Sequence, residues 1–204
     1  MASVKTILVV DDSIVSRAAL VEILNDEYRV LEASDGQEAL HLLEEHSAEF
    51  SAVMLDLVMP VIDGYDILKL LKNDIRYTNL PVVVITGDGS KANEKKALAL
   101  GAWDFVSKPY NPQIIMFRLH NVIDRSQLSA LKQLKYLADY DTLTGIYNKT
   151  KFFTATRDMI DANLGEHFVF LRFDVDRFQL INSFFGIAEG DRLFIFLNTW
   201  RRTP

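Results

Sequence analysis

The sequence lacks cysteine entirely, and it has neither a basic excess nor a long apolar run. The absence of cysteine excludes disulfides, thiolate nucleophiles and cysteine metal sites. With 28 acidic against 22 basic residues the formal net charge is -6, so no general basic field recruits DNA or an anionic membrane. The apolar run before Asp11 is far shorter than the roughly 20 residues of a membrane span. We therefore expect a cytoplasmic protein with no nucleic-acid partner and no membrane insertion.

Short apolar runs recur between amphipathic helical patterns in this chain of 204 residues, which is 49% apolar and 25% charged. The runs TILVV, AVMLD and PVVVIT have the continuous apolarity of strands that are buried on both faces of a parallel sheet. Strands are predicted near Thr6, Arg29, Ala52, Pro81 and Asp104, and helices from Ser13, over 36–45, from Gly64 and over 91–101. This order predicts an α/β fold in residues 1–124, a doubly wound parallel sheet of (βα)5 type.

The residues that follow the predicted strands are polar and chemically complementary. Asp11 and Asp12 follow the first strand, Asp56 ends the third, Thr86 ends the fourth before Gly87 and Asp88, and Ser107, Lys108 and Pro109 end the fifth. A doubly wound sheet binds its ligand outside the carboxyl ends of its strands, so three carboxylates, a hydroxyl and an ammonium should converge there. Clustered carboxylates repel one another unless a cation lies among them, and hard oxygen ligands at an open site favour Mg²⁺.

This cluster predicts phosphoryl chemistry at an aspartate. A carboxylate beside Mg²⁺ can act as a nucleophile toward a phosphoryl group while the metal and a lysine neutralise its oxygens, which gives an aspartyl phosphate. Taken singly, each residue also fits a helix cap or a turn. An enzyme that hydrolyses small phosphate esters through the same intermediate is a second interpretation. The order of the strand-end residues and the absence of a substrate-gripping insertion favour a signalling switch.

The motifs VVDDS, VMLDLVMPVIDG, VVVITGDG and FVSKPYN resemble those of the receiver domain of two-component response regulators, over residues 1–124. The resemblance implies that Asp56 accepts a phosphoryl group from a histidine kinase or a phosphotransfer protein. It also implies that Asp11, Asp12, Asp56 and the backbone carbonyl of Val58 hold Mg²⁺, and that Thr86 and Lys108 contact the phosphoryl oxygens. Pro60 and Gly64 are expected to shape the turn beside Asp56.

The receiver family couples the threonine hydroxyl to an aromatic side chain on the following strand, and Phe105 occupies that position here. Phenylalanine has no polar tip. We therefore expect this switch ring to move between exposed and buried positions without gaining or losing a hydrogen bond.

A single helix is predicted from Pro112 to about Ala138, because the stretch has no glycine and its only proline lies in the opening turn. Ile115, Leu119 and Val122 fit a face on the first domain, and Leu128, Leu131, Leu134 and Leu137 continue an apolar stripe beyond it. Residues 125–140 are therefore predicted to form a helical linker. The stripe fits equally a helix that pairs with a second chain and one that packs on its own second domain.

Residues 141–204 are predicted to be the N-terminal part of a second domain. In DYDTLTGIYNKTKF, Asn148 is a good N-cap for a helix through about Ala162, and the stretch HFVFLRFDVD after it is predicted to be a strand. This combination resembles the start of a GGDEF domain, the diguanylate cyclase family.

The GGDEF resemblance implies roles for four positions. Asp174 and the carbonyl of Val175 would bind a metal, and Asn182 and Asp191 would contact the guanine of GTP, which suits their donor and acceptor groups. Without the resemblance, Asp174 ends a strand, Asn182 lies on a helix surface and Asp191 caps the next helix.

The pattern also departs from the GGDEF family, because Gln179, Ser183 and Ile187 stand where it has Lys, Asp and His. The GGDEF hairpin would follow Asp191 beyond the end of the sequence, so we expect a truncated domain that has no cyclase activity by itself. The predicted function is a phosphorylation-dependent response regulator that controls a cyclic di-GMP-related output. In the alternative, the domain is degenerate and regulates a phosphodiesterase EAL domain. Apolar surface left uncovered is expected to drive self-association or homodimerisation through the linker and the C-terminal part.

Overall fold

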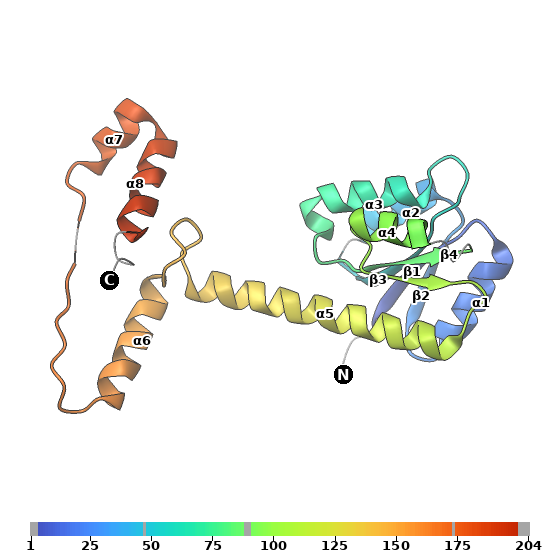
Figure 1. The fold of residues 1–204 in the computed structure, drawn as a ribbon, viewed down its shortest axis with the longest axis horizontal. Helices are drawn as coiled ribbons and strands as arrows, with labels where there is room; N and C mark the ends of the chain where they lie inside the picture. Colours follow the sequence, from blue (N-terminus) through green and yellow to red (C-terminus); the bar gives the residue numbers. More distant parts are fainter. Residues whose placement is uncertain (1–3, 47, 88–90, 173, 200–204) are drawn as a thin grey trace. The chain divides into compact units, whose positions relative to one another are not determined.

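The structure is a computed structural model that describes residues 4–46, 48–87, 91–172 and 174–199. Its internal contacts divide the chain into two compact units, with the division between Ala130 and Leu131. The long helix α5 (Pro112–Asp139) crosses this division (Figure 1). The single helix predicted after the sheet is therefore confirmed.

The first unit is built on a five-stranded sheet in the order β2-β1-β3-β4-β5, with every neighbouring pair parallel. Its strands are β1 (Thr6–Val10), β2 (Arg29–Ala33), β3 (Phe50–Asp56), β4 (Val82–Thr86) and β5 (Asp104–Ser107). All residues of β1 and β4 are buried, as continuous apolarity predicts for strands covered on both faces. The predicted doubly wound α/β fold is confirmed.

Helices cover both faces of this sheet (Figure 1). They are α1 (Ile14–Leu24), α2 (Gly36–Glu45), α3 (Gly64–Asn73), the 3-10 helix η1 (Ile75–Tyr77), α4 (Lys91–Ala99) and the first part of α5. One core cluster joins Leu20 and Leu24 of α1 to Ile115, Leu119 and Val122 of α5. The other joins the sheet to α2, α3 and α4 through Leu43, Ile67 and Ala97. The apolar face predicted for the start of α5 is thus buried on the sheet.

Side-chain caps begin the helices that leave the carboxyl ends of the strands. Ser13, Asp35 and Asp63 each accept a backbone N–H from the residue three positions on, at the starts of α1, α2 and α3. At α2 the Glu38 carboxylate also reaches back, and its Oε2 accepts the N–H and the hydroxyl of Ser34, at 2.7 Å each. These bonds resemble a capping box shifted by one residue, because Glu38 accepts from Ser34 and not from the N-cap Asp35, and they fix the loop after β2.

The second unit contains the end of α5 and the helices α6 (Lys149–Ala162), α7 (Phe178–Phe185) and α8 (Ile187–Thr199). Asn148 caps α6 as predicted, because its Oδ1 accepts the Lys151 N–H at 2.9 Å. The strand predicted over 167–176 is wrong, since the described residues 167–172 and 174–176 form no strand. A strand needs a hydrogen-bonded neighbour, and within the described ranges no strand pairs with this segment.

The turn between α5 and α6 is closed by its own hydrogen bonds. Oδ1 of Asp141 accepts the N–H and the hydroxyl of Thr144, at 2.8 and 2.6 Å. Tyr140 and Tyr147 form an isolated antiparallel bridge, and their ring centroids lie 5.1 Å apart. The DTLTG stretch is therefore an ordered turn that brings the end of one helix to the start of the next.

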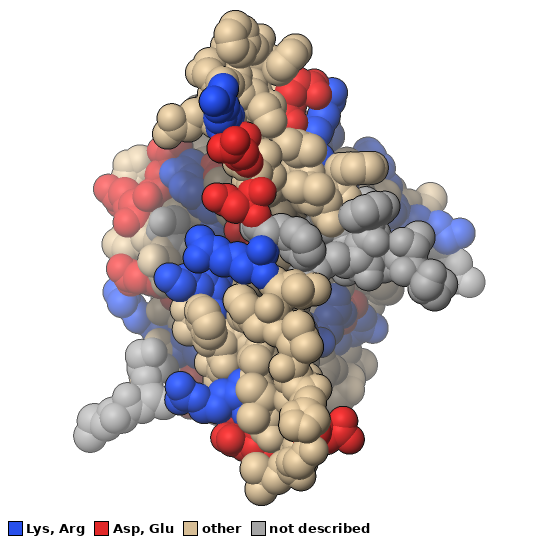
Figure 2. Space-filling model, turned by 90° about the vertical axis from the view of Figure 1, so that its left-hand side faces the viewer, with Lys and Arg blue, Asp and Glu red and all other residues tan. Residues whose placement is uncertain are grey.

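The surface carries charges of both signs. On the face drawn in Figure 2, lysine and arginine side chains lie beside aspartates and glutamates, with broad uncharged areas between them. That face offers no extended basic surface, in keeping with the net charge of -6. Among the helices of the described ranges, none combines the length and the apolarity that a membrane span needs.

Candidate functional site

Three aspartates meet at the carboxyl edge of the first unit's sheet. Asp11 and Asp12 directly follow β1, and Asp56 is the last residue of the neighbouring strand β3. One carboxylate oxygen of each lies within 4.8 Å of the other two. Asp11 and Asp56 are buried and Asp12 is exposed, so the group is open to solvent on one side. Hard oxygen donors at a half-open site fit Mg²⁺, which keeps some of its water ligands.

Lys108 supplies positive charge to this cluster. It follows β5, and its Nζ lies 2.6 Å from Oδ2 of Asp56 and 2.9 Å from Oδ2 of Asp11. Burial disfavours the ammonium, but the hydrogen bonds to the two carboxylates outweigh this and raise the pKa of Lys108 above its ordinary value. The lysine is therefore charged at neutral pH, and it lies within reach of any group bound to Asp56.

Asp11 is the most deeply buried member of the cluster. Burial raises the pKa of its carboxyl, against hydrogen bonds from Lys108 and from the Ser13 N–H that lower it. Arg17, which was not predicted from the sequence, holds the loop in place: its Nη1 donates to the Asp11 carbonyl at 2.7 Å, and its Nε pairs with Glu32 of β2 at 3.3 Å. Its place in the first turn of α1 is the one sequence signal for this role.

Thr86 ends β4, the strand that separates Asp56 from Lys108. Its Oγ1 is buried and has no hydrogen-bond partner among the described residues. A buried hydroxyl without a partner costs free energy, which a ligand oxygen would relieve. A cavity of about 40 Å³, whose lining includes Asp56, Val58 and Thr86, lies beside it. Asp88, which the sequence places just beyond Thr86, lies outside the described residues.

A close backbone contact shapes the loop after β3. A Cβ on Gly64 would lie 2.2 Å from the carbonyl oxygen of Asp56 and 2.8 Å from Cα of Leu57, so only glycine fits this position. The Val58 N–H donates to Oδ1 of Asp56 at 3.1 Å, which orients the carboxylate. Val61, further along the loop, has a φ of 68°, a left-handed conformation that β-branched residues rarely adopt.

Phe105 lies on β5 at the edge of the sheet, opposite Val84 of β4, and its ring is partly buried against the core on the α2, α3 and α4 side. Arg118 of α5, which the sequence did not indicate, lies over this ring with its guanidinium carbon 5.0 Å from the ring centroid. The same guanidinium pairs with the Asp104 carboxylate. The Phe105 N–H donates to that carboxylate at 2.8 Å.

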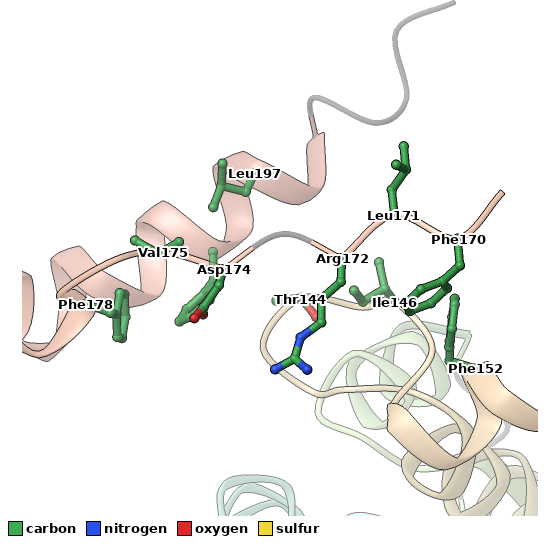
Figure 3. Close-up of a pocket in the computed structure, with 11 residues that line it drawn as sticks. Thr144, Ile146, Phe152, Phe170, Leu171, Arg172, Asp174, Val175, Phe178 and Leu197 are labelled. Carbon is green, nitrogen blue, oxygen red and sulfur yellow. The ribbon is translucent and has the colours of Figure 1, made fainter.

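In the second unit, Asp174 lines a cavity of about 500 Å³ (Figure 3). The walls are mostly apolar and come from the segment around Asp174, the 144–146 turn, α6, α7 and α8. Figure 3 shows Phe170, Leu171 and Arg172 on an extended segment that passes the turn carrying Thr144. Among the described residues, no group of three or more potential metal ligands includes Asp174.

The two predicted guanine contacts lie on different helices. Asn182 is in α7 with its Oδ1 buried toward α8, where a Cβ on Gly190 would lie 2.0 Å from it. That oxygen has no hydrogen-bond partner within the described ranges. Asp191 lies inside α8, so the interpretation of Asp191 as a helix cap is wrong: the helix already begins at Ile187.

Comparison with protein-family models assigns both parts of the chain. The model described as "Response regulator receiver domain" matches residues 7–120. The model described as "Diguanylate cyclase, GGDEF domain" matches residues 138–199. The aspartate cluster lies in the first match, and the turn and helices of the second unit lie in the second.

Three relatives show how far the likeness extends. Response regulator GtcR of Aneurinibacillus migulanus is 32% identical over 127 residues, which are 60% of this chain and 49% of that protein. A Vibrio cholerae protein described as "Probable cyclic di-GMP phosphodiesterase" is 34% identical over 134 residues, 65% of this chain and 30% of that protein. A solved structure described as a "probable two-component system response regulator/GGDEF domain protein" has a TM-score of 0.57 at 30% identity, and the match covers 60% of this chain and 50% of that one. This chain spans half or less of each.

Proposed function

The chain belongs to the response-regulator receiver family, and on this premise we propose that it is a phosphorylation-dependent switch whose Asp56 accepts a phosphoryl group from a histidine kinase or a phosphotransfer protein. The observation that carries the proposal is the buried Oγ1 of Thr86, which has no hydrogen-bond partner among the described residues. Thr86 ends the strand between those that carry Asp56 and Lys108 to one edge of the sheet. A hydroxyl and an ammonium beside a carboxylate are the groups that a phosphoryl oxygen needs.

In the proposed reaction, a carboxylate oxygen of Asp56 forms a bond to phosphorus while the bond from phosphorus to the donor imidazole nitrogen breaks and leaves its electron pair on that nitrogen. Lys108, now 2.6 Å from Asp56, pairs with one phosphoryl oxygen. Thr86 donates its hydroxyl hydrogen to another. In the phosphorylated state, the hydroxyl of Thr86 therefore points toward the phosphoryl group on Asp56.

Asp11, Asp12, Asp56 and the backbone carbonyl of Val58 would hold Mg²⁺. The fit rests on the three carboxylates within 4.8 Å of one another, of which Asp12 is exposed to solvent. Lys108 alone leaves the cluster with an excess of negative charge. Bound Mg²⁺ would neutralise that excess and the charge of the phosphoryl oxygens.

The proposal is tested by incubation with Mg²⁺ and acetyl phosphate, followed by intact mass. We expect one added phosphoryl group, and we expect Asp56→Asn to abolish the addition. The exposed Asp66 of α3 supplies a matched control, because Asp66→Asn should leave the addition intact. An unmodified wild-type mass under conditions in which Mg²⁺ binds would contradict the proposal.

A receiver domain followed by a GGDEF domain supports a response regulator with a cyclic di-GMP-related output. We propose that phosphorylation of Asp56 controls this output. Asp174 and the carbonyl of Val175 would be metal ligands in the second domain, and Asn182 and Asp191 would contact guanine. Equilibrium dialysis with GTP and Mg²⁺ tests these roles, since binding should be lost in Asn182→Ala.

A second candidate for the output is a regulatory domain without catalysis. It is favoured by Ser183, whose hydroxyl donates to the backbone carbonyl of Gln179 within α7 at 2.8 Å. It is also favoured by Gln179, which stands where the GGDEF family has a lysine. The Vibrio cholerae relative, described as a phosphodiesterase, also fits a role in regulating such an enzyme. The absence of GTP binding in the same dialysis would favour this candidate.

We further propose that copies of the chain associate through the linker and the C-terminal part. Leu128, Leu131, Leu134 and Leu137 of α5 are all exposed, at 48 to 63% of their surface. An apolar stripe of this kind is stabilised by a second helix. Light scattering across a range of concentrations should show a mass above that of the monomer, and Leu131→Asp with Leu134→Asp should lower it. A constant monomeric mass would contradict the proposal.

We place the protein in the cytoplasm and exclude nucleic acid from its partners. The proposed phosphodonors and a GTP-derived signal are intracellular. The net charge of -6 disfavours binding to a polyanion. Microscopy of a fluorescent fusion and a filter-binding assay with duplex DNA check the two statements.

A further inference from the structure

We propose that Arg118 is a positioning residue that holds the ring of Phe105 in its partly buried position and thereby sets how readily Asp56 becomes phosphorylated. The inference rests on the proposed function of Asp56. Phenylalanine has no hydroxyl with which a hydrogen bond could fix the ring, and the inference assigns this role to the guanidinium of Arg118.

Phe105, Arg118 and Asp104 each contact the other two. Arg118 lies with its guanidinium carbon 5.0 Å from the ring centroid of Phe105, and the same guanidinium pairs with Asp104. Asp104 in turn accepts the Phe105 N–H at 2.8 Å. One carboxylate therefore fixes both the backbone that carries the ring and the cation that covers it. A cation over an aromatic face is attractive because of the ring quadrupole.

Packing leaves this ring room to move. β5 is the edge strand, so among the described residues no further strand covers its outer side. A cavity of about 120 Å³ lies next to the ring, and its lining includes Phe105, Ile114 and Arg118. Because the core holds the ring from only one side, the contact with Arg118 decides how strongly it keeps its present position.

The ring of Phe105 and the side chain of Thr86 lie on one face of the sheet. β4 and β5 pair in parallel with Val84 opposite Phe105 and Thr86 opposite Ser107, so the side chains of Thr86 and Phe105 point to the same face. When Thr86 turns its unpartnered hydroxyl toward a phosphoryl group on Asp56, the space next to the ring changes. In the proposed switch the ring leaves its present position in that change, so a contact that is lost with this position opposes phosphorylation by the free energy lost.

The expected effect follows from the strength of a partly exposed cation–π contact. Removing the guanidinium should raise the affinity for beryllofluoride with Mg²⁺ by about two- to fivefold, and it should raise phosphorylation by acetyl phosphate in the same direction. The effect is modest because the ring also packs on the core, which the substitution leaves in place.

The test compares Arg118→Gln with Arg118→Lys and Arg125→Gln. Arg125 is a matched control on the same helix, since its guanidinium carbon lies 5.2 Å from the ring centroid of Trp103, which is not the switch residue. Lysine retains a cation for the ring and for Asp104, so Arg118→Lys should behave like the wild type. Phosphorylation is read by intact mass, beryllofluoride binding by calorimetry, and folding by the midpoint of thermal unfolding.

A double substitution shows whether Arg118 acts through the ring. In a Phe105→Leu background, Arg118→Gln should have no further effect, because the aromatic face is gone. The inference is overturned if Arg118→Gln matches Arg125→Gln, or if its effect persists in the Phe105→Leu background. A wild-type protein that neither gains a phosphoryl group nor binds beryllofluoride would overturn the proposed function instead, so the two failures are distinguishable.

Discussion

Nζ of Lys108 lies 2.6 Å from Oδ2 of Asp56, and this contact joins the residue after β5 to the last residue of β3 across the strand between them. The same Nζ lies 2.9 Å from Oδ2 of Asp11, which is fully buried. The ammonium of Lys108 is therefore a single positive group beside the three carboxylates at this edge of the sheet. The electrostatic balance of the site depends on this side chain whenever no cation is bound.

Lys108→Ala should lower the free energy of unfolding by about 1–3 kcal/mol at neutral pH in EDTA, because buried carboxylates lose their partner while the partial exposure of the lysine limits the loss. Mg²⁺ should then stabilise the variant more than the wild type, since the added cation replaces the missing charge. Urea unfolding followed by circular dichroism, with and without Mg²⁺, measures both effects. Lys95 is an exposed lysine on α4, and Lys95→Ala is the control. The prediction is contradicted if Mg²⁺ stabilises Lys108→Ala no more than it stabilises the wild type.

Gly64→Ala should displace the end of β3, because the new Cβ would lie 2.2 Å from the Asp56 carbonyl oxygen. We expect a loss of about 2 kcal/mol or more in unfolding free energy and a large loss of Asp56 phosphorylation. Gly87→Ala is a matched control, since a Cβ there meets no atom of the described residues within 4 Å. Both variants are compared by urea unfolding and by intact mass after acetyl phosphate, and equal behaviour of the two would show that the close approach does not matter.

The sequence predicts the sheet and its cluster for a physical reason. Runs such as VVVIT mark strands that are buried on both faces, and parallel strands bring residues such as Asp11, Asp56 and Lys108 to one edge. The contacts of Arg17 and Arg118 escaped prediction because a charged side chain that reaches another element leaves no periodic signal. They depend on how far apart the elements lie after packing.

In the second unit the sequence predicts the local structure less well than in the first. The segment 167–176 has the composition of a strand, yet its described residues form none, because pairing depends on a neighbour elsewhere in the chain and not on local preference. The alternative interpretation of Asp191 as a helix cap also fails, although aspartate is a common cap, because α8 already begins at Ile187. Helix ends such as Asn148, whose cap is local, were predicted correctly.

Glu38 should make the stability of the first unit depend on pH. Hydrogen bonds from the N–H and then the hydroxyl of Ser34 lower the pKa of Glu38 below its ordinary value of 4.5. A lowered pKa stabilises the fold fully above 4.5, and this contribution disappears as the pH falls through the folded-state pKa. The difference in unfolding free energy between wild type and Glu38→Gln should therefore shrink on acidification. Urea unfolding from about pH 3 to 7 measures this difference, and a difference that stays constant over the range would contradict the prediction.

Val61→Asn should stabilise the protein. Val61 has a φ of 68° and is 86% exposed, so the valine bears the strain of the left-handed conformation while its side chain contributes little packing. Asparagine adopts this conformation more readily, and we expect the unfolding free energy to rise by about 1 kcal/mol. Val58→Asn, also exposed but without a positive φ, should show no such gain. Thermal and urea unfolding compare the two, and a gain in both variants would point to surface polarity as the cause.

Asn148 should prove to be the residue that ties the end of α5 to the start of α6. Its Nδ2 donates to the Ala138 carbonyl at 2.7 Å, while its Oδ1 caps α6 through the Lys151 N–H at 2.9 Å. Asn148→Ala should therefore accelerate amide hydrogen exchange in the last turn of α5 and the first turn of α6 together, with a cap loss of about 1 kcal/mol.

Asn148→Asp separates the two contacts, because aspartate retains the capping oxygen but has no donor for the Ala138 carbonyl. We expect exchange to remain slow at the start of α6 and to rise only at the end of α5. Asn163→Ala, which removes a hydrogen bond to the Met159 carbonyl at the far end of α6, should affect neither turn. Wild-type exchange at the end of α5 in Asn148→Asp would instead assign the joint to contacts that the substitution leaves intact, which are the bridge between Tyr140 and Tyr147 and the ion pair between Lys151 and Asp139. Since α5 leads from the receiver sheet to this turn, these exchange rates measure how firmly the end of that helix is held to the start of α6.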